Sequence, residues 1–222
     1  MYTLYCGNKN YSSWSLRAWL LLTHFGIPFD ERMVSVSGRG VSDDHRQYSG
    51  NGLVPCLHDD GFQVWETLAI AEYLAERHPG IWPAGALARA RARSVSAEMH
   101  SGFAALRGAM PMNIKLQLRG RPVDVAVQAD IDRITEVWSE CRQQFGQGGP
   151  WLFGRFSAAD AMYAPVVWRF WTYNVPLSAS AEAYRDAMLG LPAMKLWQMG
   201  ALAEEACIPE CDALVADFGG VR

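Results

Sequence analysis

Residues 51–74, NGLVPCLHDDGFQVWETLAIAEYL, constrain the fold of this chain more than any other segment. The apolar run 53–57 contains Pro55, which cannot donate a hydrogen bond to a sheet and so belongs at a strand start or on an edge. Residues 58–61 form a polar turn that ends in Asp-Gly, a strong hairpin signal, and 62–65 alternate like a second strand. A helical pattern begins at Glu66. The segment therefore predicts a strand, a hairpin, a second strand and a helix.

Two joints of this unit are candidate binding positions. The peptide bond between Val54 and Pro55 is of the type that can be cis, and a cis bond would turn the Val54 amide and carbonyl outward. Glu66 and Thr67 place a carboxylate, a hydroxyl and free backbone amides at the start of a helix. Such a helix start binds a carboxylate well, because the helix dipole adds to the hydrogen bonds.

These residues resemble the glutathione-binding half of the glutathione transferases. The family pattern is G-x-V-P-x-L, a hairpin, an acidic residue with Ser or Thr, and A-I-x-x-Y-L, and the chain matches it at 52–57 and 66–74. The resemblance implies that Val54, beside a cis Pro55, pairs with the cysteinyl backbone of glutathione. It also implies that Glu66 and Thr67 bind the γ-glutamyl end. The alternative is an ordinary hairpin followed by a capped helix, with no ligand.

Bulk composition narrows the class of protein. The 222 residues suffice for two small domains, and the net charge of −3 gives no reason to expect nucleic acid or an anionic membrane as partner. No apolar run approaches the ~20 residues of a membrane span. Cys207 and Cys211 lack nearby histidines, so no metal site is expected. The five scattered cysteines and the absence of a signal-peptide pattern predict a reducing, cytoplasmic location.

The order of predicted elements gives the fold class. Residues 1–79 read as strand, helix, strand, short helix, strand, strand and helix, which is an α/β thioredoxin-like domain around a four-stranded sheet. Residues 80–86 read as a linker, and 87–222 as an all-helical domain that forms the second-substrate pocket, together the glutathione transferase fold. The predicted helices of this second domain cover residues 87–113, 124–145, 157–173, 181–189 and 193–206. Ser157 and Asp160 fit a capping box, and Pro165 should kink the helix that they start.

The resemblance extends to a group that would hold the glutathione sulfur as a thiolate. Residues 11–17, YSSWSLR, are similar to the zeta-class segment S-S-C-x-x-R. Aligned without a gap, Ser12 falls on the catalytic serine, Ser13 on the second serine and Arg17 on the arginine, whereas Trp14 replaces the class cysteine. We assign Ser12 to the sulfur and Ser13 to a helix cap or second donor, since serines before a helix often cap it. Rival donors are the side chains of Tyr5, Tyr11 and Cys6.

Other charged and apolar residues are candidates for the ends of the two substrates. Arg39 and His45 lie where a basic group could bind the glycyl carboxylate, although loops carry such charges anyway. Arg169 lies in an aromatic helix, and because a buried charge needs a partner it could hold an acidic substrate. The residues assigned to the second substrate, each with a structural role as the alternative, are Arg17, Met110, Arg169 and Tyr173.

The resemblance implies an enzyme in which the glutathione thiolate attacks a small hydrophobic electrophile, a detoxification reaction, with glutathione as co-substrate. One alternative is a glutathione-dependent cis–trans isomerase of the maleylacetoacetate type, against which Trp14 counts. Another is a non-catalytic interaction protein that kept the fold. The family also implies a homodimer.

Overall fold

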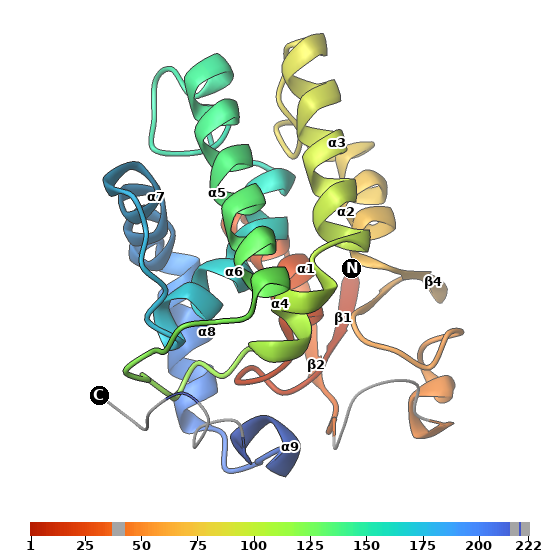
Figure 1. The fold of residues 1–222 in the computed structure, drawn as a ribbon. Helices are drawn as coiled ribbons and strands as arrows, with labels where there is room; N and C mark the ends of the chain where they lie inside the picture. Colours follow the sequence, from red (N-terminus) through yellow and green to blue (C-terminus); the bar gives the residue numbers. More distant parts are fainter. Residues whose placement is uncertain (37–42, 214–217, 219–222) are drawn as a thin grey trace.

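The computed structural model describes residues 1–36, 43–213 and 218 (Figure 1). Arg39 lies outside the described residues. The first third of the chain forms a sheet with two helices, and the remainder is helical, which confirms the predicted fold class. None of the helices in the described ranges is long and apolar enough to cross a membrane.

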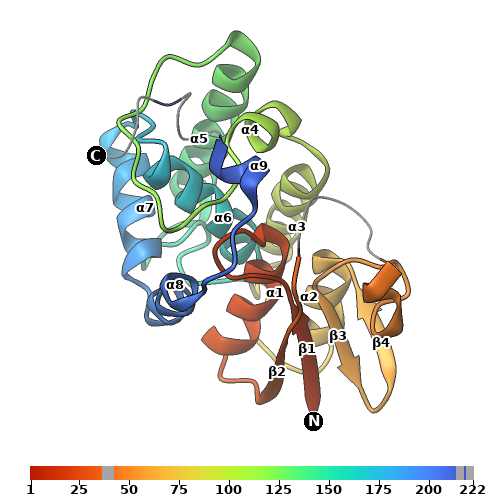
Figure 2. The ribbon, with the colours of Figure 1, turned by 90° about the horizontal axis from the view of Figure 1, so that it is seen from below.

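The sheet has four strands in the order β2-β1-β3-β4 (Figure 2). They are β1 (Tyr2–Cys6), β2 (Phe29–Met33), β3 (Cys56–Asp59) and β4 (Phe62–Trp65). Strand β1 pairs in parallel with β2 and antiparallel with β3, and β3 pairs antiparallel with β4. Strand β3 begins at Cys56, so residues 53–55 precede the strand instead of opening it, because proline lacks the amide that the ladder would use.

Two helices belong to the sheet, α1 (Ser13–His24) and α2 (Thr67–Ala75), and a 3-10 turn, Asp43–Gln47, lies between β2 and β3. Helix α1 is apolar on most sides because it packs against both β1 and α6, and eight consecutive residues from Ser15 to Leu22 are buried. The buried helix fixes the loop before it, which carries the two predicted serines.

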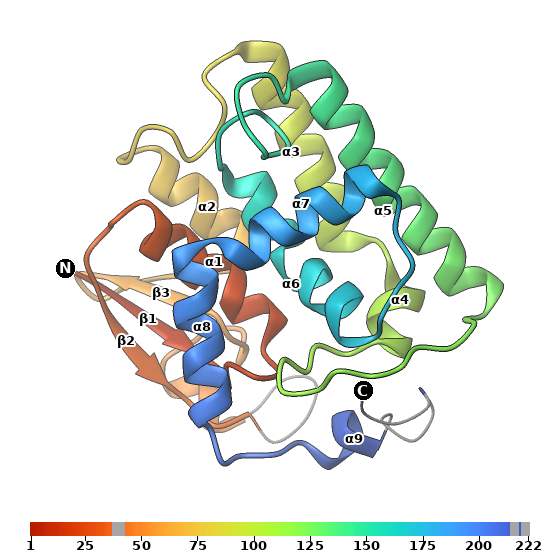
Figure 3. The same ribbon diagram turned by 90° about the vertical axis from the view of Figure 1, so that its left-hand side faces the viewer.

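The helical part surrounds α6, whose residues are almost all buried (Figure 3). Its helices are α3 (Ala86–Ser101), α4 (Ala104–Ala109), α5 (Val125–Phe145), α6 (Ala158–Thr172), α7 (Ala179–Gly190), α8 (Pro192–Ala203) and α9 (Pro209–Asp212). The capping box of Ser157 and Asp160 is confirmed, and Pro165 lies inside α6 as predicted. The chain after α8 turns back, so that α9 lies near the loop before α1 (Figure 2).

The prediction of one helix over residues 87–113 is wrong. Helix α3 ends at Ser101, where Gly102 is extended and Phe103 takes a left-handed backbone with φ of 57°, and α4 then starts in a new direction. A Cβ on Gly102 would lie 2.7 Å from the Glu98 carbonyl oxygen, so this sharp exit needs glycine. The alanines and leucines on both sides continue the helical pattern and hide the break.

Candidate active site

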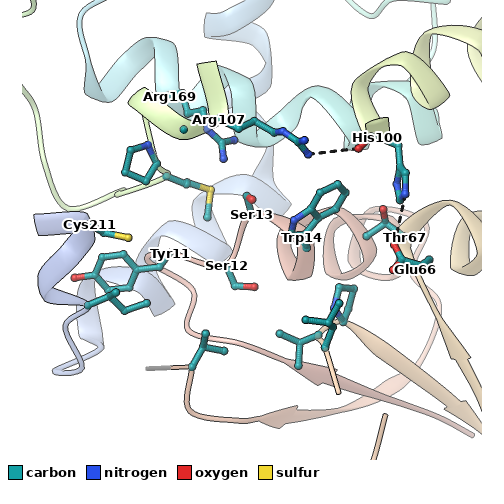
Figure 4. A pocket seen from close by; sticks show the side chains of 18 of the residues that line it. Tyr11, Ser12, Ser13, Trp14, Glu66, Thr67, His100, Arg107, Arg169 and Cys211 are labelled. Carbon is teal, nitrogen blue, oxygen red and sulfur yellow. Dashed lines mark hydrogen bonds and ion pairs between the residues drawn. The ribbon is translucent and has the colours of Figure 1, made fainter. Parts of the chain in front are cut away.

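A cavity of about 590 Å³ lies between the sheet and the helical part (Figure 4). One wall comes from the loop before α1, the Val54–Pro55 bend and the start of α2; the opposite wall comes from α3, α4, α6 and α9. The side chains discussed below that line it are Tyr11, Ser12, Ser13, Trp14, His45, Asn51, Val54, Pro55, Glu66, Thr67, His100, Arg107, Met112, Arg169 and Cys211.

The Val54–Pro55 peptide bond is cis, as the sequence allowed, and both residues line the cavity. Next to them, Glu66 holds a φ of 69°, a backbone conformation that residues with a Cβ rarely adopt and that costs of order 1 kcal/mol or more. Backbone strain of this kind is concentrated at binding sites, where the surrounding structure holds it in place. The two predicted joints therefore meet at one cavity.

The start of α2 carries an unusual polar atom. Thr67 is only 2% exposed, and its Oγ1 is buried with no hydrogen-bond partner among the described residues. The first amides of α2 lie beside it, because Glu66 gives the helix no side-chain cap. Since a buried hydroxyl without a partner is costly, a carboxylate at this helix start would satisfy it.

The Glu66 carboxylate is held from both sides of the cavity. Its Oε2 lies 3.5 Å from Nε2 of His100 on α3, and its Oε1 accepts a 3.4 Å hydrogen bond from Nδ2 of Asn51. These contacts keep the acidic group at the mouth of α2, where it can meet an ammonium group of a ligand.

The two serines have different surroundings. Ser12 is the N-cap of α1: its Oγ accepts a 3.4 Å hydrogen bond from the Ser15 amide and donates at 2.8 Å to Ser15 Oγ. Ser13 is the first helical residue, so the prediction that it serves as the cap is wrong. Both serines line the cavity (Figure 4).

Ser15 is a hydrogen-bond partner of Ser12 that sequence reasoning missed. Its hydroxyl is fully buried and accepts a 2.9 Å hydrogen bond from the Gly7 amide at the end of β1. A hydroxyl is both donor and acceptor, so the Ser12–Ser15 hydrogen bond can reverse and leave the Ser12 proton for a ligand.

The rival sulfur donors are engaged elsewhere. The Tyr11 hydroxyl donates to both carboxylate oxygens of Asp212 on α9, at 2.9 and 3.0 Å, and burial is the main cause that raises its pKa. The ring of Tyr5 stacks on Tyr48 with centroids 4.6 Å apart, away from the cavity. Burial also raises the pKa of the Cys6 thiol, which is fully enclosed in β1. Ser12 and Ser13 remain the better-placed hydroxyls.

The structure brings some predicted ligand contacts to the cavity and not others. His45 lines it, with Nε2 3.0 Å from the Ser35 carbonyl oxygen, and Arg169 lines it as well. Met110 and Tyr173 do not: the Met110 carbonyl accepts a hydrogen bond from Arg169 Nε, and the buried Tyr173 hydroxyl donates to the Pro111 carbonyl. Helix α4 ends at Ala109 and the chain continues beyond it in a non-helical conformation, so Met112 lines the cavity and Met110 does not.

Arg17 is not at the cavity surface. It is 1% exposed, its Nε donates to the Met162 carbonyl at 2.9 Å, and its guanidinium stacks on Trp14. The predicted direct contact between Arg17 and a substrate is therefore not supported, because Trp14 stands between the two.

Three lining residues of the helical part that carry an imidazole, guanidinium or thiol side chain were missed from the sequence. His100 and Arg107 are seven apart and would share a face of the predicted single helix, a signal that could have been used. Cys211 reaches the cavity only because α9 returns to the loop before α1 (Figure 4), and no local pattern shows that.

Comparison with known proteins decides the family. Residues 11–77 match the family model described as glutathione S-transferase, N-terminal domain, and residues 124–197 match the C-terminal domain of the same family. The chain belongs to the glutathione transferase family.

Individual relatives of this glutathione transferase family member are distant. The chain is 25% identical to a stringent starvation protein A homolog of Coxiella burnetii, over 82% of this chain and 83% of the relative. It is 24% identical to a probable maleylacetoacetate isomerase of Caenorhabditis elegans, over 86% and 89%. A glutathione transferase homolog from Burkholderia, crystallised with bound glutathione, superposes with a TM-score of 0.70 at 24% identity, over 91% of this chain and 99% of the other.

The matched ranges leave out part of the cavity wall. His100 and Arg107 lie between the two segments that match the family models. The Val54–Pro55 bend and the start of α2, by contrast, lie inside the first matched range, and Arg169 lies inside the second.

Proposed function

We propose that this chain is a glutathione-dependent transferase, in which the glutathione thiolate attacks a small electrophile in the cavity. The observation that carries the proposal is the meeting of the cis Val54–Pro55 bend, the unpartnered Thr67 hydroxyl and the Ser12 hydroxyl in one cavity. The binding of glutathione by the Burkholderia homolog supports it.

The residues present suit a tripeptide with two carboxylates and an ammonium group. Thr67 and the first amides of α2 would bind the γ-glutamyl carboxylate, and Glu66 would bind the γ-glutamyl ammonium. The outward backbone of Val54 would pair with the cysteinyl residue, as one strand pairs with another. His45 lies where it can meet the glycyl carboxylate.

Ser12 would then act on the sulfur. A free thiol is mostly protonated at neutral pH, and a hydrogen bond to the thiolate, together with the positive end of the α1 dipole, lowers its pKa. The thiolate forms a carbon–sulfur bond with the electrophile, and the leaving group departs with the electron pair of the bond that breaks. Ser15, held by the Gly7 amide, keeps the Ser12 oxygen in place.

A direct test uses 1-chloro-2,4-dinitrobenzene, a neutral electrophile whose chloride is displaced by thiolates. We expect the purified chain to bind immobilised glutathione and to accelerate this conjugation above the uncatalysed rate. Failure to bind glutathione would contradict the proposal and would favour the non-catalytic interaction protein.

Thr67→Val removes the unpartnered hydroxyl at an almost unchanged volume. We expect the Kd for glutathione to rise about tenfold, because a hydrogen bond to a charged carboxylate contributes roughly 1.5 kcal/mol or more. Calorimetric titration measures it. Thr23→Val is the matched control, since Thr23 Oγ1 is also buried, has no hydrogen-bond partner within the described ranges, and lies away from the cavity. An unchanged Kd in Thr67→Val would contradict this placement of the γ-glutamyl group.

An isomerase of the maleylacetoacetate type is the second candidate, and the Caenorhabditis elegans relative favours it. In that reaction glutathione adds to a dicarboxylic enone and leaves again, so glutathione is not consumed. Product analysis with such an enone separates the two functions: an isomerised enone with unchanged glutathione identifies the isomerase, and a stable conjugate identifies the transferase.

We further propose a cytoplasmic homodimer with a role in detoxification. Support for the dimer is the exposed apolar surface of the edge strand β4, where Phe62 is 65% and Trp65 is 42% exposed. Sedimentation at micromolar concentration is expected to give twice the monomer mass of 24.7 kDa, and a monomer would contradict the assignment.

A further inference from the structure

Three arginines gather on the side of the cavity formed by the helical part. Arg107 of α4 and Arg169 of α6 line the cavity (Figure 4), and the buried Arg17 of α1 packs against the ring of Trp14. The guanidinium carbon of Arg17 lies 4.1 Å from the centroid of the Trp14 ring, and that of Arg107 lies 5.7 Å from it. One indole thus contacts two cations, one buried and one at the cavity.

Two of these charges lack a counter-ion in the described part of the chain. Arg17 is 1% exposed, and its two terminal nitrogens have no hydrogen-bond partner. Arg107 makes one long hydrogen bond, 3.4 Å from Nη1 to the His100 carbonyl, and its Nε is buried without a partner. A buried cation without a counter-ion is costly, so folding alone does not account for this arrangement.

The cations also act on one another. Burial, followed by the neighbouring charges of Arg169 and Arg107, lowers the pKa of Arg17. Glu66 is the one acidic residue among the described residues that line the cavity, and its carboxylate is held by His100 and Asn51 at the start of α2. The wall around Arg107 therefore carries a positive potential that an anion would offset.

We propose that the electrophile carries a carboxylate, which Arg107 binds while Arg17 supplies a positive field behind it. An arginine presents a planar pair of donors that fits a carboxylate, and Trp14 provides a flat surface for the body of the substrate. The inference rests on the proposed function and replaces the predicted purely hydrophobic electrophile by an anionic one.

The geometry places the carboxylate away from the reacting sulfur. Arg107 belongs to α4 on the helical side, whereas Ser12 belongs to the opposite wall, with Trp14 between them (Figure 4). A substrate whose carboxylate meets Arg107 can direct its other end toward Ser12. The positive charge thus orients the electrophile as well as attracting it.

The test uses a matched pair of aryl chlorides, 4-chloro-3,5-dinitrobenzoate and 4-chloro-3,5-dinitrobenzamide. Glutathione displaces chloride from both, and each kcat/KM is divided by the uncatalysed rate constant to remove the difference in reactivity. We expect wild type to favour the benzoate at least about tenfold, and Arg107→Gln to reduce this preference about tenfold, since one hydrogen-bonded charge pair is removed. Arg91→Gln, a charge removal on exposed α3 surface outside the cavity, should keep the wild-type preference.

Binding gives a readout that does not depend on catalysis. The glutathione conjugates of the two aryl chlorides are titrated calorimetrically against wild type and Arg107→Gln, and the benzoate conjugate should lose about tenfold more affinity than the amide conjugate. Circular dichroism and the melting temperature show whether the variant is folded.

The outcomes separate the two proposals. If wild type conjugates the benzamide but shows no preference for the benzoate, the anionic electrophile is wrong and the transferase proposal stands. If Arg107→Gln weakens the binding of glutathione and keeps the preference for the benzoate, Arg107 binds a carboxylate of glutathione and the inference is also wrong. If wild type accelerates neither reaction and does not bind glutathione, the proposed function fails first.

Discussion

Ser12→Ala is expected to lower kcat/KM for glutathione conjugation about a hundredfold, the typical effect of removing one donor to a developing or resident anion. The cause is loss of the hydrogen bond to the sulfur, so the pKa of the bound glutathione thiol should rise by about 1 to 2 units toward its value in free solution. The ultraviolet absorbance of the thiolate, followed against pH with saturating glutathione, measures that pKa. A thiol pKa that is the same in wild type, the variant and free solution would overturn the mechanism.

The same substitution removes a helix cap, so the effects must be separated. Ser12 Oγ accepts from the Ser15 amide, and its loss should cost about 1 kcal/mol of unfolding free energy. Ser178→Ala is the matched control, because Ser178 caps α7 in the same way, through the Ala181 amide, outside the cavity. Ser178→Ala should lose a similar unfolding free energy and keep the wild-type kcat/KM. Ser13→Ala tests the other hydroxyl. If this variant loses more kcat/KM than Ser12→Ala, the hydrogen bond to the sulfur is assigned to Ser13 instead.

Asp160→Ala is expected to cost about 4 kcal/mol of unfolding free energy, more than a simple cap. The carboxylate is fully buried and accepts four hydrogen bonds, from the amides of Leu152 and Ser157 and from the hydroxyls of Ser157 and Tyr184, at 2.9 to 3.1 Å. Burial raises the pKa of Asp160 to about 6, while the four donors favour the ionised form. Alanine leaves buried donors without an acceptor, which is the source of the cost.

Urea unfolding at pH 7.5 measures the change, because Asp160 is then largely ionised. Asp124→Ala is the matched control: Asp124 caps α5 through one hydrogen bond to the Val127 amide, so about 1 kcal/mol is expected. Asp160→Asn keeps the shape of the side chain and part of the hydrogen bonding, so its loss of unfolding free energy should lie between those of Asp124→Ala and Asp160→Ala. Equal losses of unfolding free energy in Asp160→Ala and Asp124→Ala would show that Asp160 acts only as a helix cap.

Local sequence predicted the glutathione side of the cavity because its features are local in the chain. The Val54–Pro55 bend, the Asp-Gly hairpin and the Glu66–Thr67 helix start lie within a few residues of one another, and each depends on backbone chemistry that a residue type fixes. Ser12, whose role at the sulfur stays a prediction, was placed at the cavity by the same kind of local reasoning. Its assignment as the cap was missed, because Ser12 and Ser13 are chemically equal candidates until the first helical residue is known.

The second-substrate side was predicted less well, since distant segments build it. The exit at Gly102 and Phe103 changes the direction of the chain, which brings Arg107 to the cavity while the side chains of Met110 and Tyr173 face elsewhere. A helical pattern shows which residues share a face but not where a helix stops inside an alanine-rich run.

The sequence by itself determined the fold class, the family resemblance and the residues proposed to hold glutathione, because each follows from a short run with one favoured backbone conformation. Only the tertiary structure decided that Trp14 separates a buried arginine from one at the cavity, and that α9 closes over the loop before α1. Those arrangements come from packing between elements as far as two hundred residues apart in the chain, as with Tyr11 and Asp212. No local propensity determines them.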